Sequence, residues 1–292
     1  MGKYGDYIGQ NGIESMACLG YTDKKDGEKM DSVNRTLYIP LYGKALVSRM
    51  GLFLQDEKAE QIWQQESFPL KGKAGSKWLA YSMAMRAAVF DRWLEDRRKQ
   101  MPNAVVLHLG CGMDSRILRV GSAEGTWFDV DFPEVIRERQ RYFGETEHYH
   151  MLGADLRDLT WLEKIPEGNA VVVMEGISMY LKTHQLQALL AALTAHFQQV
   201  AVLMDSYTTL GAKATKYKNP INTVGVTQVY GLDDPQTVVK GTALECIREV
   251  DMNPMDLIRQ LPARDQKIFS RFFAGKLAKK LYRMYEYEKK SQ

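Results

Sequence analysis

Two closely spaced glycines and two acids form a pattern that can bind a nucleoside. Gly110 and Gly112 directly follow the apolar run VVLHL, whose β-branched residues are typical of a buried parallel strand. Glycines at such a turn let a ligand lie against the backbone, because no side chain intervenes. The later run GTWFDVDFPEV contains a second strand candidate that ends on Asp129 and Asp131. An acid at the tip of this strand can accept hydrogen bonds from ribose hydroxyls, so the pattern predicts a nucleoside-containing ligand.

The glycine pattern also narrows the class of nucleoside. The dinucleotide fingerprint G-x-G-x-x-G would need a third glycine at position 115, which is Ser115. That third glycine allows a helix to pack closely on the strand beside a pyrophosphate. The chain also has no G-x-x-x-x-G-K-[ST] phosphate loop. A nucleoside without a pyrophosphate, such as S-adenosylmethionine (SAM), therefore fits better than the cofactor of a dehydrogenase.

Alternating strand and helix patterns position these residues. Strand candidates lie near residues 104–109, 126–130, 148–152, 170–174 and 200–205, with helices between them, including one at 183–197. This alternation predicts an α/β fold with a mainly parallel, doubly wound sheet. Two later strand candidates, at 243–250 and 281–287, predict an antiparallel pair at one edge.

The region before the first strand has a helical pattern. The clearest helix is predicted at 77–97, where an apolar stripe recurs at helical spacing: Leu79, Met83, Ala87, Phe90 and Leu94. We expect residues 1–100 to form a helical N-terminal cover that belongs to the same domain as the core at 101–292. A loop-like stretch at about 208–240 is expected to cap the core.

Four longer motifs occur in a fixed order: LHLGCGMDSR, WFDVDFPEVI, GADLRDLTWL and VVVMEGISMYL. In this order and at this spacing they resemble the leucine carboxyl methyltransferase family. The segments NRTLYIPLYGKALVSRM and KYKNPINTVGVTQVYGLDDP resemble its bacterial branch, which includes a polyketide O-methyltransferase of the tetracenomycin pathway. The resemblance extends from Thr36 to the C-terminus. It implies a Rossmann-like class I methyltransferase fold with SAM as the cofactor.

The resemblance also implies ligands for the nucleoside part of SAM. Asp131 matches the acid of the family's Asp-Phe-Pro motif and is the expected ribose ligand. Asp129 is the alternative, because alternate residues of a strand share one face. Asp155 and Leu156 match the corner that binds adenine. For Asp155 the alternative is a helix N-cap or an ion pair with Arg157.

Three further residues are expected near the methionine part of SAM. Glu175 ends the apolar run AVVVM at the sheet edge that faces the ligand crevice. The resemblance implies that it lies near the methionine part of SAM, where it can take the ammonium group. Arg86 matches the arginine that the family uses on the cofactor carboxylate, and its guanidinium fork suits a two-pronged contact. Its alternative is a surface arginine whose stem covers apolar neighbours. Lys44 is expected to share the same carboxylate.

The methyl acceptor is predicted to be a carboxylate or hydroxyl of a small molecule, including a polyketide-like acid. The bacterial-type segment 219–235 is expected over the crevice, with Tyr207, Tyr217 and Tyr230 as candidate walls of the acceptor site. A carboxylate acceptor needs no general base, whereas a hydroxyl does, and the sequence identifies no catalytic residue. The alternatives are a protein C-terminal carboxyl methyltransferase and a non-catalytic nucleoside-binding protein.

Composition excludes several other classes of protein. With 45% hydrophobic and 26% charged residues the chain is typical of a globular protein, and a net charge of +3 does not indicate a nucleic-acid partner. Cys18, Cys111 and Cys246 are too few and too far apart for a disulfide framework. His148 and His150 have no further His or Cys cluster, so no metal site is predicted. Without a membrane span or secretory signal, we expect a cytoplasmic protein that binds no membrane.

Overall fold

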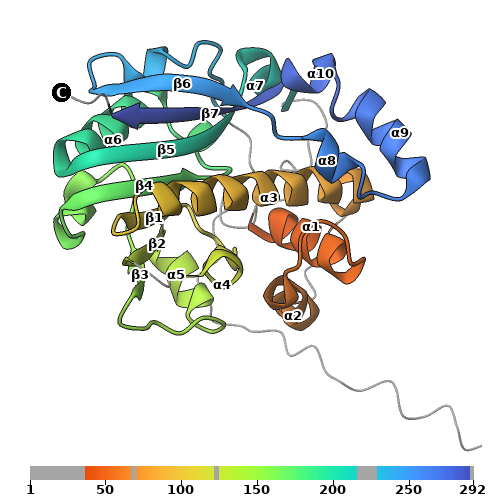
Figure 1. Cartoon of the computed structure of the whole chain (residues 1–292), viewed down its shortest axis with the longest axis horizontal. Coiled ribbons are helices and arrows are strands. Elements are labelled where there is room, and N and C mark those ends of the chain that lie inside the picture. Colours follow the sequence, from red (N-terminus) through yellow and green to blue (C-terminus); the bar gives the residue numbers. More distant parts are fainter. Residues whose placement is uncertain (1–36, 67–69, 71, 122–124, 216–228, 290–292) are drawn as a thin grey trace, which may run out of the picture. The chain divides into compact units, whose positions relative to one another are not determined.

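The computed structural model describes residues 37–66, 70, 72–121, 125–215 and 229–289 of the 292-residue chain. Within these residues seven strands form one sheet in the order β3-β2-β1-β4-β5-β7-β6 (Figure 1). The first five are parallel to one another: β1 Val105–Leu109, β2 Trp127–Asp131, β3 Tyr149–Gly153, β4 Gly168–Met174 and β5 Phe197–Tyr207. The predicted doubly wound sheet is confirmed.

The expected antiparallel pair is also present. Strand β7, Tyr282–Lys289, runs antiparallel to both of its neighbours, β5 and β6. Strand β6, Leu244–Val250, is therefore the outermost strand, and β7 lies one position inside it. This inner position places the first residue of β7, Tyr282, opposite the last residue of β5, Tyr207.

The strand order reverses between β1 and β4, and this reversal locates the ligand crevice. From β1 the chain continues to β2 and β3 on one side, whereas β4 and β5 lie on the other side. In such a sheet, ligands bind beyond the carboxyl ends of the two strands at the reversal. All of β1 is buried, as are residues 170–174 of β4, which explains why both are apolar runs without alternation.

One face of the sheet carries the main apolar core. Helix α6, Thr183–His196, contributes Leu189, Leu190 and Leu193, which pack with alternate strand residues such as Val172 and Val202. The short helix η3, Leu159–Lys164, packs beside α6 on this core. Removal of these side chains from water is the main stabilising contribution on this face.

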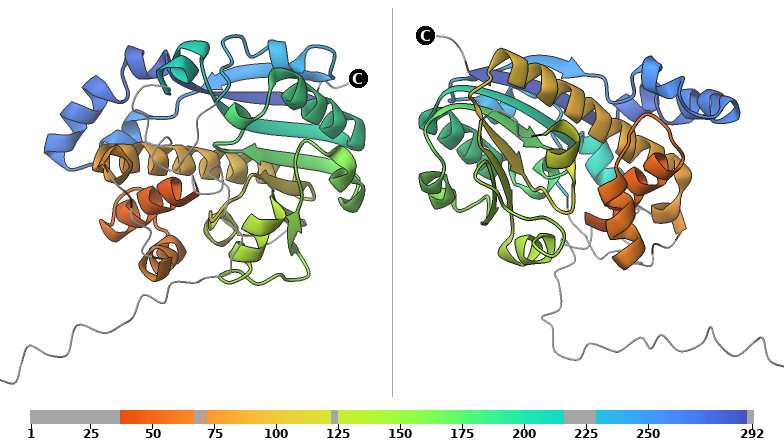
Figure 2. Two further views of the ribbon diagram at one scale, coloured as in Figure 1. Left: turned by 180° about the vertical axis from the view of Figure 1, so that it is seen from behind. Right: turned by 60° about the horizontal axis from the view of Figure 1, so that its bottom comes forward.

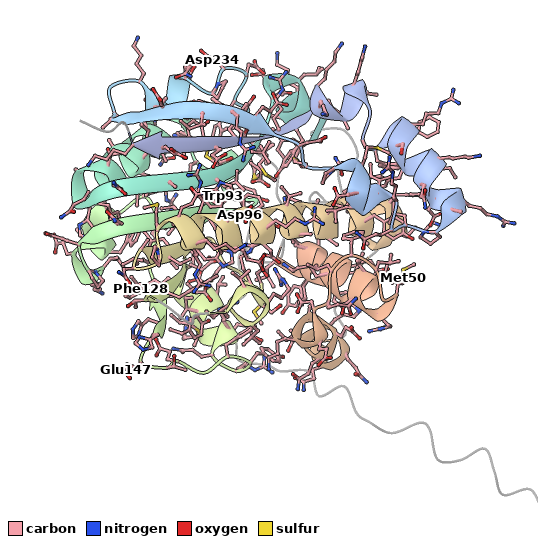
Figure 3. The ribbon with its side chains drawn as sticks, viewed as in Figure 1. Met50, Trp93, Asp96, Phe128, Glu147 and Asp234 are labelled. Atoms are coloured by element: carbon pink, nitrogen blue, oxygen red, sulfur yellow. The ribbon has the colours of Figure 1, made fainter. Side chains whose placement is uncertain are left out.

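The opposite face is covered by α3, Lys77–Gln100, with α4, Arg116–Val120, and α5, Pro133–Arg139 (Figure 2). Helix α3 begins at Ser76, whose hydroxyl accepts a hydrogen bond from the Trp78 N–H at 3.3 Å. It is buried well beyond the predicted stripe, because it lies between the sheet and a further helix. Trp93, for example, which is labelled in Figure 3, donates its indole N–H to Glu286 of β7.

Helices α1, Tyr38–Arg49, and α2, Glu57–Glu66, pack on the outer side of α3 and α4. Gly43 permits the close contact of α1 with α3, because a Cβ at this position would lie 2.9 Å from the Cβ of Met83. At the start of α2, Asp56 accepts a hydrogen bond from Ser115 and pairs with Arg119 at 2.5 Å. Helices are thus observed in the described part of residues 37–100, whereas residues 1–36 of the predicted cover lie outside the described residues and the boundary at residue 100 stays a prediction.

The other helices are short and connect these layers: η2 Gly72–Gly75, η4 Ser178–Tyr180, α7 Thr209–Thr215, η6 Thr237–Val239, α8 Met255–Ile258, α9 Ala263–Phe272 and α10 Lys276–Lys279. Most of the segment 219–235, expected over the acceptor site, lies outside the described residues. No helix in the described ranges is long and apolar enough to span a membrane.

Candidate functional site

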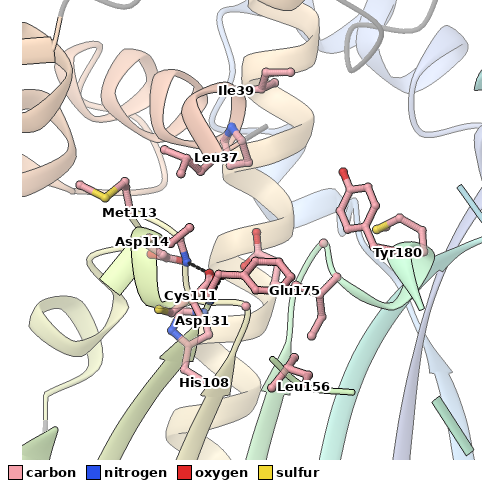
Figure 4. Close-up of a pocket in the computed structure, with 18 of the residues that line it drawn as sticks. Leu37, Ile39, His108, Cys111, Met113, Asp114, Asp131, Leu156, Glu175 and Tyr180 are labelled. Carbon is pink, nitrogen blue, oxygen red and sulfur yellow. Dashed lines mark hydrogen bonds between the residues drawn. The ribbon is translucent and has the colours of Figure 1, made fainter. Parts of the chain in front are cut away.

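A cavity of about 480 Å³ lies at the carboxyl ends of β1 to β5, where the strand order reverses. Its volume is within the range of ~300–1,000 Å³ that is usual for sites of small molecules. All eight residues predicted to contact a nucleoside cofactor line it: Lys44, Arg86, Gly110, Gly112, Asp131, Asp155, Leu156 and Glu175. Figure 4 shows Leu37 and Ile39 at one end of this cavity and His108, Asp131 and Leu156 at the other.

The glycine turn after β1 forms part of the cavity wall. Gly110 and Gly112 both have positive φ, at 69° and 51°. A Cβ on Gly110 would lie only 1.9 Å from the Cγ2 of Ile177, so a larger residue does not fit here. Gly110 and Gly112 both line the cavity, while Ile177 fills the space beside Gly110, and contact of this turn with a ligand stays a prediction.

Asp131 and Asp129 have different surroundings. Asp131 lines the cavity, and its carboxylate accepts hydrogen bonds from the N–H groups of Gly112 and Phe132, both at 2.8 Å. Burial raises the pKa of Asp131, while the two N–H groups act in the opposite direction. Asp131 is thus the acid that a ligand in this cavity can reach.

Asp129 is fully buried and does not line the cavity. Its carboxylate pairs with Arg139 at 2.5 Å and accepts hydrogen bonds from Trp127 and Tyr149. Burial alone would raise the pKa of Asp129, but Arg139 and the hydrogen bonds outweigh it and lower the pKa to about 2. Asp129 therefore holds α5 on the sheet, and of the two acids Asp131 is favoured as the ribose ligand.

At the end of β3, Asp155 and Leu156 line the cavity next to each other. Asp155 forms an ion pair with Arg157, whose Nε lies 2.8 Å from Oδ1. Its hydrogen bonds to Arg157 lower the pKa of Asp155. The pairing anticipated as the alternative is therefore observed, and a contact of this corner with adenine stays a prediction.

Glu175, directly after β4, is held by two guanidinium groups. Arg86 Nε lies 2.9 Å from Oε1, and Arg116 Nη2 lies 2.5 Å from Oε2. Burial alone would raise the pKa of Glu175, but the two arginines lower it to about 2. The carboxylate is therefore ionised at neutral pH, and the two arginines already balance its negative charge. Its contact with an ammonium group stays a prediction.

This shift predicts a specific loss of stability in acid. The pKa of Glu175 is lower in the folded chain, at about 2, than its ordinary value of 4.5. Its contribution to stability is therefore fully present above pH 4.5 and lost as the pH falls toward 2. We expect the free energy of unfolding, measured in urea, to fall more steeply over this window in the wild type than in Glu175→Gln. Equal slopes for the two proteins would contradict the assignment.

Lys44 and Arg86 are paired with protein carboxylates. Lys44 Nζ lies 3.2 Å from Oδ2 of Asp114, and both side chains are buried. Arg86 is only 4% exposed, which excludes the alternative of a surface arginine. Its Nε and Nη1 are engaged by Glu175 and Asp205, so the expected two-pronged contact with a ligand is not available unless one of these ion pairs breaks.

The candidate acceptor residues are placed differently. Tyr207 lines the cavity and packs edge-on against Tyr282, with 4.6 Å between the ring centroids. Tyr230 does not line the cavity. Its backbone N–H donates a hydrogen bond to the carbonyl of Met179, which is a lining residue. Tyr217 lies outside the described residues.

Sequence reasoning missed several residues that build the site. His108 is buried in β1, with its ring nitrogens 3.1 Å from Asp129 and from Arg116. Arg116, fully buried, also pairs with Asp91 and Asp114. His108 could have been found as a polar residue inside an apolar strand. Arg116 could have been found as the last residue of the motif LHLGCGMDSR. In the described ranges no cluster of three or more His, Cys, Asp or Glu could hold a metal ion.

Comparisons with known proteins agree with this geometry. The leucine carboxyl methyltransferase family matches residues 29–194. The tetracenomycin polyketide synthesis O-methyltransferase TcmP of Streptomyces glaucescens is 30% identical over 213 residues, which cover 72% of this chain and 79% of that protein. The S-adenosyl-L-methionine-dependent methyltransferase dpfgK of Gibberella zeae is 29% identical over 180 residues, or 56% of this chain and 60% of that protein. A crystal structure of a Thermobifida fusca YX protein described as a methyltransferase has a TM-score of 0.56 at 14% identity, covering 87% of this chain and 94% of that chain.

Proposed function

The chain belongs to the leucine carboxyl methyltransferase family, and on that premise we propose that it methylates an oxygen atom of a small organic acid. It is a SAM-dependent methyltransferase with a Rossmann-like class I fold. The observation that supports a small acceptor is the composition of the cavity wall. Beside the polar residues at the strand ends lies an apolar lobe, formed by Leu37, Ile39, Leu79 and Met83.

The cavity fits SAM by the chemistry of its wall. Gly110 and Gly112 line the cavity without side chains, so a ligand can lie against the backbone of this turn. Asp131 would hold the ribose hydroxyls, Asp155 and Leu156 the adenine, and Lys44, Arg86 and Glu175 the amino and carboxyl groups of the methionine part. When bound, SAM supplies an electrophilic methyl group on a positively charged sulfonium. The protein then has to align the acceptor with this methyl and exclude water.

The acids of the cavity wall favour a carboxylate acceptor over a hydroxyl. Glu175 is paired with two arginines, Asp114 with Lys44 and Arg116, and Asp155 with Arg157. Such pairing makes a carboxylate a weak base, because the neighbouring cation stabilises its ionised form.

His108 is also a poor candidate for a base. One ring nitrogen lies against Asp129 and the other against Arg116. The remaining lining carboxylate that the structure describes, Asp131, accepts two backbone N–H groups and is the proposed ribose ligand. If it binds the ribose, no carboxylate or imidazole of the described lining is left to deprotonate a hydroxyl. A carboxylate acceptor, with a pKa near ~4, needs none.

Methyl-labelled SAM tests this proposal directly. Incubated with the protein and a cell extract, it is expected to label the small-molecule fraction. Mild alkali should release that label as methanol, because base hydrolyses methyl esters and leaves methyl ethers intact. Alkali-stable label would point to a hydroxyl acceptor. Label confined to the protein fraction would contradict a small-molecule acceptor and favour a protein carboxyl methyltransferase. An extract incubated without the protein is the control.

A polyketide-like acid is the specific acceptor class that we propose to test first. The similarity to TcmP covers 72% of this chain, and TcmP is an O-methyltransferase of tetracenomycin polyketide synthesis. Tyr207 and Tyr180 add aromatic surface to the cavity wall, which suits a flat aromatic acid.

A further inference from the structure

Arg86 of α3 is held by the ends of three different strands. Its Nε lies 2.9 Å from Glu175, which directly follows β4. Its Nη1 lies 3.1 Å from Asp205 near the end of β5, and 3.0 Å from the hydroxyl of Tyr282 at the start of β7. The strands that make up one half of the sheet therefore converge on a single guanidinium group.

The Tyr282 hydroxyl links two members of this group. It accepts a hydrogen bond from Arg86 and donates one to Oδ2 of Asp205 at 2.9 Å. Asp205 is fully buried, and its other oxygen accepts the N–H of Gly176 at 2.7 Å. Burial raises the pKa of Tyr282 well above its ordinary value, so the hydroxyl stays protonated and is not a base. Its contribution is to fix geometry.

The third nitrogen of Arg86, Nη2, has no hydrogen bond to any described residue. It lies over the α-carbon of Gly176, where a Cβ would be only 3.3 Å away. Arg86, Gly176 and Tyr282 all line the cavity. Two nitrogens of the guanidinium are thus fixed by the protein, and the remaining one is left for a ligand.

We propose that Tyr282 is a positioning residue, which acts through Arg86 to orient Nη2 toward the carboxylate of the cofactor's methionine part. This role rests on the proposed binding of that carboxylate by Arg86. Without the Tyr282 hydroxyl, Asp205 keeps only Arg86 and Gly176 as partners, and the guanidinium is free to turn toward it. Nη2 would then move away from the ligand.

Two ligands that differ only in the amino-acid part test the proposal. S-adenosylhomocysteine carries the carboxylate, whereas 5′-methylthioadenosine lacks it. Tyr282→Phe keeps the ring and removes the hydroxyl. By titration calorimetry we expect it to weaken S-adenosylhomocysteine about tenfold, as for loss of a hydrogen bond to a charged group. Binding of methylthioadenosine should stay within about twofold of the wild type, since that ligand has no group for Arg86 to bind.

Tyr287→Phe is the matched control, because Tyr287 lies on the same strand and its buried hydroxyl has no hydrogen-bond partner among the residues that the structure describes. It should leave both affinities unchanged. Equal weakening of both ligands by Tyr282→Phe would show a general structural role and overturn the proposal, as would unchanged binding of S-adenosylhomocysteine. If Tyr282→Phe does not fold, Asp205→Asn removes the charge that holds the same hydroxyl and should show the same selectivity. Wild-type protein that binds neither ligand would overturn the proposed function, and the role of Tyr282 with it.

Discussion

Replacing Arg116 by alanine is expected to lower the free energy of unfolding by about 3–5 kcal/mol, the usual cost of breaking a buried ion pair by removing one partner. Arg116 is fully buried and pairs with Asp91, Asp114 and Glu175. Without it each of these carboxylates keeps fewer cations while it remains away from water. The loss is a large part of the ~5–15 kcal/mol that stabilises a typical domain.

Arg92→Ala is the matched control for Arg116→Ala. Arg92 also forms an ion pair, at 2.6 Å to Asp256, but its side chain is 49% exposed and that of Asp256 is 57% exposed. Exposed pairs contribute about 0–1 kcal/mol, because water and salt screen them. Urea denaturation of both variants measures the difference. A loss of less than about 1 kcal/mol in Arg116→Ala would contradict the prediction. It would mean that Lys44 and the other arginines are enough to compensate the buried carboxylates without Arg116.

Replacing Asp131 by alanine is expected to weaken SAM binding by about 1–3 kcal/mol, through loss of charge-assisted hydrogen bonds to the ribose. Asp129→Ala is expected to act on folding instead, because it leaves the fully buried Arg139 without its carboxylate. Two acids only two positions apart on the same strand should thus differ in which measurement they affect most.

Calorimetric titration with S-adenosylhomocysteine, together with urea denaturation of both variants, separates these effects. Asp131→Ala should lose affinity and, since it frees only two backbone N–H groups at the cavity, lose less stability than Asp129→Ala, which leaves a buried guanidinium unpaired. If Asp129→Ala proves the weaker binder while fully folded, the ribose ligand has been assigned to the wrong acid. If both variants bind S-adenosylhomocysteine as tightly as the wild type, neither acid is the ribose ligand.

The fold and the location of the cavity could be predicted because their signals are local in sequence. Apolar runs mark the parallel strands, and Gly110 and Gly112 mark the turn after the first of them. Asp131 is the last residue of β2 and Glu175 directly follows β4, so strand order alone brings both to one edge of the sheet. These residues line one cavity, as expected.

The charge pairing around the cavity could not be predicted, because it joins residues far apart in the chain. Tyr282 contacts Arg86 across 196 positions, and Asp56 contacts Ser115 across 59. Nothing near Tyr282 in the sequence distinguishes it from the other tyrosines of the same strand. For Arg86, the position at the cavity could be predicted, but its ion pairs with Glu175 and Asp205 could not.

The arginines of the cavity wall have a consequence for catalysis. Because Glu175, Asp114 and Asp205 fix Arg86 and Arg116, the dipoles and charges that face a ligand are oriented by the protein itself. Methyl transfer from a sulfonium to a carboxylate removes a positive and a negative charge together. In water, many solvent dipoles must turn as these charges disappear, and their rotation is part of the barrier. A wall whose dipoles are held by covalent geometry and paired charges has little freedom to turn, so its reorganisation energy is small. For the proposed carboxylate acceptor, we therefore expect the rigidity of these buried ion pairs to lower the barrier to methyl transfer, independently of what they contribute to folding.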